Sequence, residues 1–305
     1  MDIFIQQIIN GLVLGSIYAL VALGYTMVYG IMGLINFAHG EVVMIGAMVA
    51  LFTLKALSGL PAIVSVPIAL AAAAAVCMAV GYSIEIIAYR PLRRAPKLAP
   101  LITAIGISII LQHLAMLIWG RNYHAFPAVL PVSEHDIFGA TITSLQVVII
   151  VIAAAMMAGL TLLVQRTRLG RAMRATAENP PIAQLMGVNI NQIISATFVI
   201  GSALAAVAGL MVSANYSIAH YYMGFMLGLK AFTAAVLGGI GNLAGAMLGG
   251  ILLGVIESLG AGYIGDLTGG FLGSHYQDIF AFFVLIGVLI FRPSGLIGER
   301  VAERA

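Results

Sequence analysis

Four ionisable side chains stand inside long apolar stretches: Glu41, Glu85, Lys230 and Glu257. A charge in such surroundings is costly, so each is a candidate for solute or ion binding. Glu85 is close to a basic segment, and we expect it to pair with Arg90 or to reach the membrane surface. Lys230 stands near the start of its run and is expected to reach the outer surface with its long side chain. For Glu257 the simpler interpretation is a pair with a neighbouring helix.

Glu41 has a different setting, because glycines and polar residues surround it. The segment 30–41 contains three glycines together with Asn36, Phe37 and His39. These glycines loosen a helix, and a helix broken inside a membrane exposes backbone groups that can line a solute path. The alternative is that His39 and Glu41 form hydrogen bonds within the bundle and hold a bend. The pattern leaves both interpretations open.

The longest polar segment, residues 166–191, contains a second pattern. Asn179 is a good N-cap, Pro180 suits the first helical position, and Gly187 suits the position after the last turn. The sequence therefore predicts a short helix from Pro180 to Met186.

This predicted helix has one apolar stripe, because Ile182, Leu185 and Met186 follow at i, i+3 and i+4. A helix this short is not stable alone in water. It needs a partner surface, which is either the chain's own helix ends, the membrane surface or another protein. The pattern does not decide between them.

The elements that position these residues are membrane spans. The chain is 62% hydrophobic and 8% charged, whereas an ordinary soluble domain has roughly a quarter of its residues charged. Runs long enough to cross a bilayer occur at 4–28, 31–57, 61–88, 98–119, 144–165 and 192–214. A long run at 226–264 and a short one at 278–291 follow.

Basic residues indicate which loops are cytoplasmic. Most of the 14 Lys and Arg fall in three segments. They are Arg90, Arg93, Arg94, Lys97, Arg166, Arg168, Arg171, Arg174, Arg292, Arg300 and Arg304. The loops 121–143 and 264–277 then lie outside.

The same rule fixes the number of crossings. The 166–191 loop and the C-terminal tail are both expected in the cytoplasm, so an even number of membrane crossings must separate them. The run 226–264 therefore has to cross the membrane twice. We expect its break at Gly238, Gly239, Gly241 and Asn242. The predicted fold class is an all-α polytopic membrane protein of about nine transmembrane helices, with the N-terminus outside and the C-terminus cytoplasmic. Eight or ten helices are the alternatives, and breaks are expected near 30–41 and 238–242.

Small residues recur at four-residue spacing, which lets helices approach closely in lipid. Gly245 belongs to such a series with Gly241 and Gly249, and Gly11 with Gly15 forms another. Packing inside the bundle is the favoured interpretation over a dedicated dimer seam.

Several function classes are disfavoured. The single Cys77 cannot form an intrachain disulfide or a thiolate metal cluster, and no metal site is expected. The basic segments lack interleaved aromatic residues, so nucleic acid is not an expected partner. No Gly-x-x-x-x-Gly-Lys-Ser/Thr loop is present for ATP, and no Gly-x-Ser-Gly motif suggests an intramembrane enzyme.

Four segments of the chain resemble a known family. Residues 170–189 resemble the cytoplasmic coupling loop of ABC importer permeases. Residues 19–25 (ALVALGY), 36–41 (NFAHGE) and 234–242 (AAVLGGIGN) are similar to branched-chain amino-acid permeases of the LivH type. The coupling-loop pattern is shared by importers of many solutes, whereas the 36–41 stretch narrows the match.

This resemblance implies a single permease domain over residues 1–305, with the coupling loop at 166–191, that imports leucine, isoleucine and valine across the bacterial inner membrane. The implied partners are a second permease chain of the LivM type, two cytoplasmic ATP-binding subunits, a periplasmic amino-acid-binding protein and membrane lipid. ATP and Mg would bind the partner ATPase, and this chain would hold no cofactor and be no enzyme.

The broken helix at 30–41 is the candidate substrate path, with Asn36, Phe37, His39 and Glu41, where the ammonium and carboxylate of an amino acid could pass. The resemblance implies roles for the coupling loop. The implied ATPase-coupling residues are Arg171, Arg174, Ala175, Glu178, Asn179, Pro180, Ala183, Leu185, Met186 and Gly187.

Two other functions remain open. One is a permease for urea or short amides. The other is an ion-coupled secondary transporter, which would need an ion site for which only Glu41 and Glu257 are candidates. The large cytoplasmic loop would then have no explanation.

Overall fold

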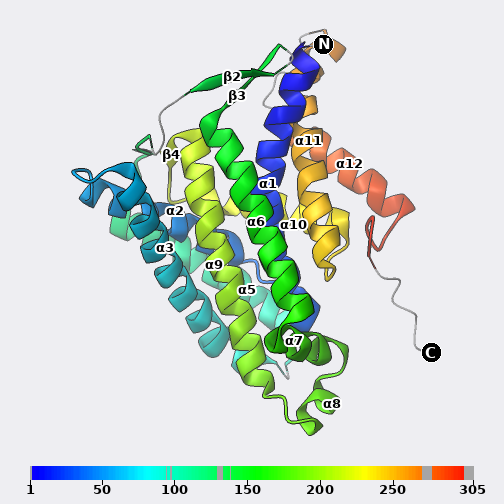
Figure 1. Ribbon diagram of the computed structural model, residues 1–305. Coiled ribbons are helices and arrows are strands. Elements are labelled where there is room, and N and C mark those ends of the chain that lie inside the picture. Colours follow the sequence, from blue (N-terminus) through cyan, green and yellow to red (C-terminus); the bar gives the residue numbers. More distant parts are fainter. Residues whose placement is uncertain are drawn as a thin grey trace.

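The computed structural model describes residues 2–93, 95–96, 98–128, 133–137, 139–269 and 277–298. Some residues that entered the sequence predictions lie outside this part, namely Arg94, Lys97, Arg300, Arg304 and the C-terminal end. The described part is dominated by helices that run roughly along one direction (Figure 1).

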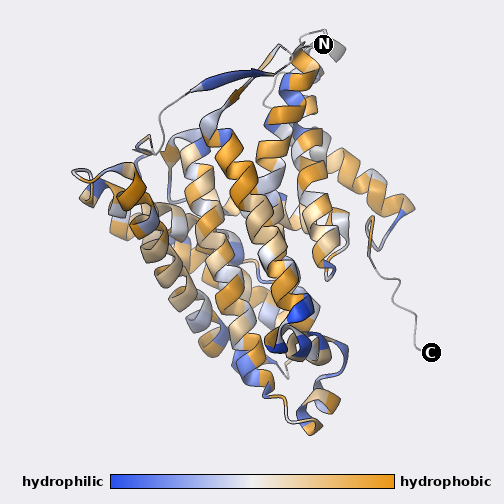
Figure 2. Ribbon diagram, viewed as in Figure 1, coloured by the Kyte–Doolittle hydropathy of each residue, from blue (hydrophilic) through white to orange (hydrophobic). Residues whose placement is uncertain are grey.

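Three helices form the buried centre. They are α1 (Asp2–Met32), α2 (His39–Ala56) and α9 (Ile190–Tyr216). Three others have few buried residues: α3 (Ala62–Ile84), α5 (Leu98–Trp119) and α6 (Ser144–Arg166). An apolar outer face is expected of helices whose solvent is lipid, and Figure 2 shows hydrophobic residues along all of them.

The C-terminal part adds three more apolar helices: α10 (Met223–Gly238), α11 (Leu243–Leu267) and α12 (Gln277–Phe291). Among the described residues, seven helices are long and apolar enough to cross a membrane, and α10 and the apolar part of α12 are shorter. Each predicted apolar run corresponds to one helix, except 226–264, which forms both α10 and α11. The chain is an all-α multi-pass membrane protein, and a total of nine crossings stays a prediction.

The polar elements gather at the two ends of the bundle. One end has α7 (Arg168–Glu178) and α8 (Pro180–Leu185). The opposite end has the N-terminus and a hairpin of β2 (Glu134–Ile137) with β3 (Ala140–Thr143) (Figure 1). A second small pair joins β1 (His124–Ala125) to β4 (Ile218–Ala219). The loops predicted to face opposite sides of the membrane do lie at opposite ends.

Both predicted helix breaks are present. Residues 33–38 separate α1 from α2, and residues 239–242 separate α10 from α11. The chain turns at these points with Gly33, Gly239 and Gly241 at positive φ, a region that glycine adopts without steric cost.

The spaced small residues pack helices inside the bundle, as predicted. Gly11 and Gly15 of α1 face α11, where a Cβ on either would lie 2.6 Å from a backbone Cα, that of Val255 or Ile251. Backbones this close gain dispersion contacts that larger side chains prevent.

We expect Gly15→Leu to prevent α1 and α11 from packing, at a cost of about 3 kcal/mol or more from the steric overlap. The measurement is the monodisperse fraction after detergent extraction, by size-exclusion chromatography. Gly159→Leu on α6 is the matched control, because no atom lies within 4 Å of a Cβ at that position. Equal recovery of both variants would show that the close approach of α1 and α11 does not stabilise the folded protein.

Candidate functional site

The break between α1 and α2 is held by Asn36. Its Oδ1 accepts a hydrogen bond from the Ala38 amide at 3.2 Å and another from the Tyr89 hydroxyl at 3.3 Å. The same hydroxyl lies 3.2 Å from the carbonyl of Ile35. Tyr89 belongs to η1 (Glu85–Tyr89), a single wide turn at the end of α3. Asn36 therefore has a structural role whether or not it also lines a path.

Glu41 lies in the first turn of α2 and is 1% exposed. Its Oε1 accepts hydrogen bonds from Gln112 Nε2 at 2.7 Å and Ser108 Oγ at 3.2 Å, both on α5. Its Oε2 has no hydrogen-bond partner among the described residues. Gly224 adjoins this oxygen, since a Cβ there would lie 2.7 Å from it. A buried carboxylate oxygen without a donor is costly, which favours a functional role for Glu41.

An aromatic cluster adjoins the carboxylate. The His39 ring meets Tyr25 edge to face at 5.0 Å, and Phe232 lies 6.1 Å from Tyr25 and 5.4 Å from Phe37. Of the four predicted path residues, Asn36, His39 and Glu41 are buried at this break and Phe37 is half-buried.

The sequence predictions missed Ser108 and Gln112. The two are spaced i, i+4 on a largely apolar helix and are both buried. Polar residues at that spacing share one helix face, and this spacing could have identified them as partners of an intramembrane acid.

The other three ionisable residues are in ion pairs. Glu85 accepts from Arg90 at 2.7 Å, from Arg93 and from Ser195 Oγ at 2.7 Å. Pairing with Arg90 is thus confirmed. Glu257 pairs with Lys230 at 2.5 Å, which confirms the neighbour-helix interpretation.

The prediction that Lys230 extends to the outer surface is wrong. Its ammonium turns to the buried Glu257 instead, because an intramembrane carboxylate lowers the cost of keeping the cation inside.

The second candidate region is the polar loop 166–191, at the end of the bundle that has α7 and α8. Asn179 caps α8 through its Oδ1, which accepts from the Ile182 amide at 3.1 Å. Pro180 is the first helical residue, and Gly187 has φ of 87°. The start and stop signals are confirmed. The helix ends at Leu185 rather than Met186, which forms the C-cap.

Before α8, helix α7 is fixed to the end of α6. Gly170 packs directly on the α6 carbonyls, and the Arg174 guanidinium donates to the carbonyl of Val164. Met173 and Thr176 are buried on the same side. Arg171, Ala175 and Glu178 are exposed on the other. The loop is therefore ordered, and α7 and α8 together are called the platform below.

The apolar stripe on α8 is exposed. Leu185 is 87% exposed, Met186 80% and Ile182 57%, while Ala183 on the opposite side is buried. The chain's own helix ends do not cover the stripe. Of the partner surfaces left open by the sequence, the membrane surface and another protein remain.

A family model described as the permease component of the branched-chain amino acid transport system matches residues 7–289. The chain belongs to this permease family. The permease is 50% identical over 311 residues to BraD of Pseudomonas aeruginosa, named a high-affinity branched-chain amino acid transport system permease protein. The match covers 99% of this chain and 98% of the relative.

The Salmonella typhimurium protein LivH has the same descriptive name and is 45% identical to the permease over 99% of this chain and 97% of the relative. A more distant match is LsrC of Yersinia enterocolitica, named an autoinducer 2 import system permease protein. It is 27% identical over 64% of this chain and 53% of the relative.

In this permease the two helix breaks meet beside α7. A Cβ on Gly30 would lie 3.4 Å from the carbonyl oxygen of Gly241. A cavity of about 100 Å³ joins these two glycines to Met173 and Arg174 of α7. Helix α7 therefore lines the same cavity as the residues next to both breaks.

The tail after α12 completes the second break. The amides of Leu296 and Ile297 donate to the carbonyls of Leu237 and Gly238, each at 2.9 Å. Asn242 donates from its side chain to the carbonyl of Ile297 at 3.2 Å. These bonds satisfy carbonyls that the end of α10 leaves without helical partners.

Proposed function

We propose that this permease is the membrane-spanning subunit of an ATP-driven importer of the ABC class, and that it translocates leucine, isoleucine and valine across the bacterial inner membrane. The observation that carries the proposal is the near full-length similarity to BraD and LivH, which are named for branched-chain amino acid transport. The N-terminus then faces the periplasm, and α7, α8 and the C-terminus face the cytoplasm.

ATP hydrolysis belongs, in this proposal, to cytoplasmic partner subunits. The exposed stripe of α8 is the docking surface for one of them, because an ordered, capped helix with three uncovered apolar residues suits a protein groove. A second permease chain of the LivM type and a periplasmic amino-acid-binding protein complete the complex. Mg and ATP bind the ATPase.

Two alternatives have less support. The similarity to LsrC shows that distant relatives are named for another solute, but this match is weaker and partial. An ion-coupled transporter would need an intramembrane acid as its ion site, and because Glu257 is paired with Lys230 only Glu41 remains as a candidate. It would also leave the platform of α7 and α8 without a role.

Uptake by a host that lacks its own branched-chain transport, co-expressing the whole complex, tests the solute class. We expect labelled leucine, isoleucine and valine to enter and to compete with one another. Alanine should enter about tenfold more slowly, since lost methylene contacts discriminate by roughly that factor. Uptake of urea or acetamide that exceeds uptake of leucine would contradict the proposal.

A further inference from the structure

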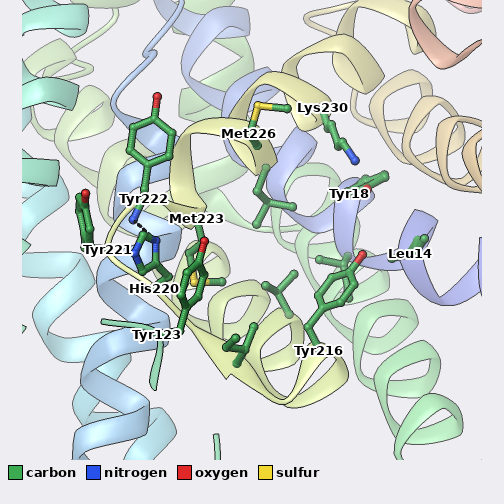
Figure 3. Close-up of a pocket in the computed structure, with 14 residues that line it drawn as sticks. Leu14, Tyr18, Tyr123, Tyr216, His220, Tyr221, Tyr222, Met223, Met226 and Lys230 are labelled. Carbon is green, nitrogen blue, oxygen red and sulfur yellow. Dashed lines mark hydrogen bonds between the residues drawn. The ribbon is translucent and has the colours of Figure 1, made fainter. Parts of the chain in front are cut away.

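A cavity of about 530 Å³ opens at the end of the molecule that has the short strands (Figure 3). It lies between α1, the end of α9 and the first turns of α10. Tyr123, Tyr216 and Tyr222 stand at its mouth, where they are 69%, 54% and 45% exposed. Small-molecule sites have this size, and none of the residues predicted for the substrate path lines this cavity.

The wall of the cavity is apolar. Leu14 and Ile17 come from α1, Val212 from α9, and Met226 and Leu227 from α10. Methionine and leucine side chains adapt to branched apolar groups of varied shape. The wall therefore suits a ligand with a small apolar side chain.

A positively charged side chain, that of Lys230, lies at one edge of the cavity. Lys230 is the only Lys or Arg among the described residues that line the cavity, and no Asp or Glu is among them. Its ammonium donates to Glu257 Oε1 at 2.5 Å, and the Tyr18 hydroxyl donates to Oε2 at 3.0 Å. Glu257 is buried behind both residues and does not line the cavity. The ion pair thus holds a positive group at the cavity wall.

An aromatic rim stands near the mouth. Tyr123 and His220 stack with ring centroids 4.1 Å apart. His220 Nδ1 accepts from the Tyr222 amide at 3.3 Å, so its proton is on Nε2, which donates to the carbonyl of Arg121 at 3.1 Å. These two contacts fix the orientation of the ring. Aromatic faces attract ammonium groups.

We propose that this cavity receives the solute, a small zwitterion with an apolar side chain. Lys230 receives its carboxylate, the aromatic rim faces its ammonium, and Met226 and Leu227 contact its side chain. The identity of the solute rests on the proposed function, whereas the chemical class follows from the lining. Gly224, next to the lining residue Met223, packs on Gly40 in the first turn of α2.

The test uses the single native cysteine. Cys77 is buried, so Cys77→Ala gives a background in which Met226→Cys reports on the cavity alone. Membranes with the complete complex are treated with methanethiosulfonate reagents of similar size, one anionic and one cationic. We expect the anionic reagent to react on the order of tenfold faster, because a charged cleft raises local counter-ion concentration.

Three further variants control for the origin of this preference. The double variant Lys230→Gln with Glu257→Gln keeps hydrogen-bonding groups and removes both charges, and it should abolish the preference. Ser133→Cys, exposed at the same end outside the cavity, should show none. Met223→Cys provides a second position on the cavity wall and should give the same result as Met226→Cys.

Ligand protection completes the test. Leucine at ten times its dissociation constant should slow labelling of Met226→Cys about tenfold by occupancy, and leucinamide, which lacks the carboxylate, should not. Equal rates for both reagents and no protection, with normal leucine uptake, would overturn the cavity and leave the proposed function intact. Protection without any leucine uptake would support the cavity and contradict the function. Equal protection by acetate would overturn the apolar class of ligand.

Discussion

Replacement of Leu185 by Asp is expected to lower leucine uptake roughly 30-fold, which corresponds to the loss of about 2 kcal/mol at a central docking residue. Leu185 is the most exposed residue of the α8 stripe and makes little contact with the rest of the chain. A carboxylate at its position leaves the fold of the permease unchanged. It would have to be desolvated in an apolar groove of the ATPase, which is costly.

The readouts are uptake and co-purification of the ATPase with the tagged permease, and both should fall together. Gln184→Asp is the matched control, because Gln184 is exposed on the same helix but points away from the stripe. It should keep at least most of the parental uptake. If Leu185→Asp retained the ATPase and transported at the parental rate, α8 would be a membrane-surface helix and no docking element.

Replacement of Glu41 by Gln is expected to lower uptake about tenfold, the equivalent of one charge-assisted hydrogen bond to the solute. ATPase docking should be unchanged. The amide oxygen of Gln still accepts from Gln112 and Ser108, so α5 stays attached to α2. The lost charge is then the main difference. Uptake and the melting temperature of the purified complex are the two measurements.

Ser108→Ala separates the path role of Glu41 from its anchoring role. It removes the longer hydrogen bond to Glu41 and keeps the carboxylate, so uptake should stay near the parental rate. A loss equal to that of Glu41→Gln would mean that Glu41 only anchors α5. Asn36→Ala is a less clean test, since it also removes the two hydrogen bonds that close the break.

The helices and their breaks were predictable because their causes are local. Length and hydropathy determine the spans, and the glycines of 238–242 permit the turn that parity requires. Asn179 and Gly187 likewise determine the ends of α8 within one residue. Each of these signals acts over a few neighbouring residues.

The partners inside the membrane were not predictable in the same way. Ser108 and Gln112 mark one polar face of α5, but the sequence does not show which helix this face meets. The contact of Gln112 with Glu41, which lies 71 residues earlier in the chain, depends on how the helices pack. The pair of Lys230 with Glu257 and the hydrogen bonds of the tail to Leu237 depend on how whole helices pack, which no local pattern records.

The central claim, that a partner ATPase drives this permease, is tested most directly in proteoliposomes that contain the complete complex and its binding protein. Labelled leucine should accumulate only when ATP is supplied on the side of α8, and ionophores that collapse proton and sodium gradients should leave the rate unchanged. Accumulation without ATP, driven by an imposed ion gradient, would contradict the account.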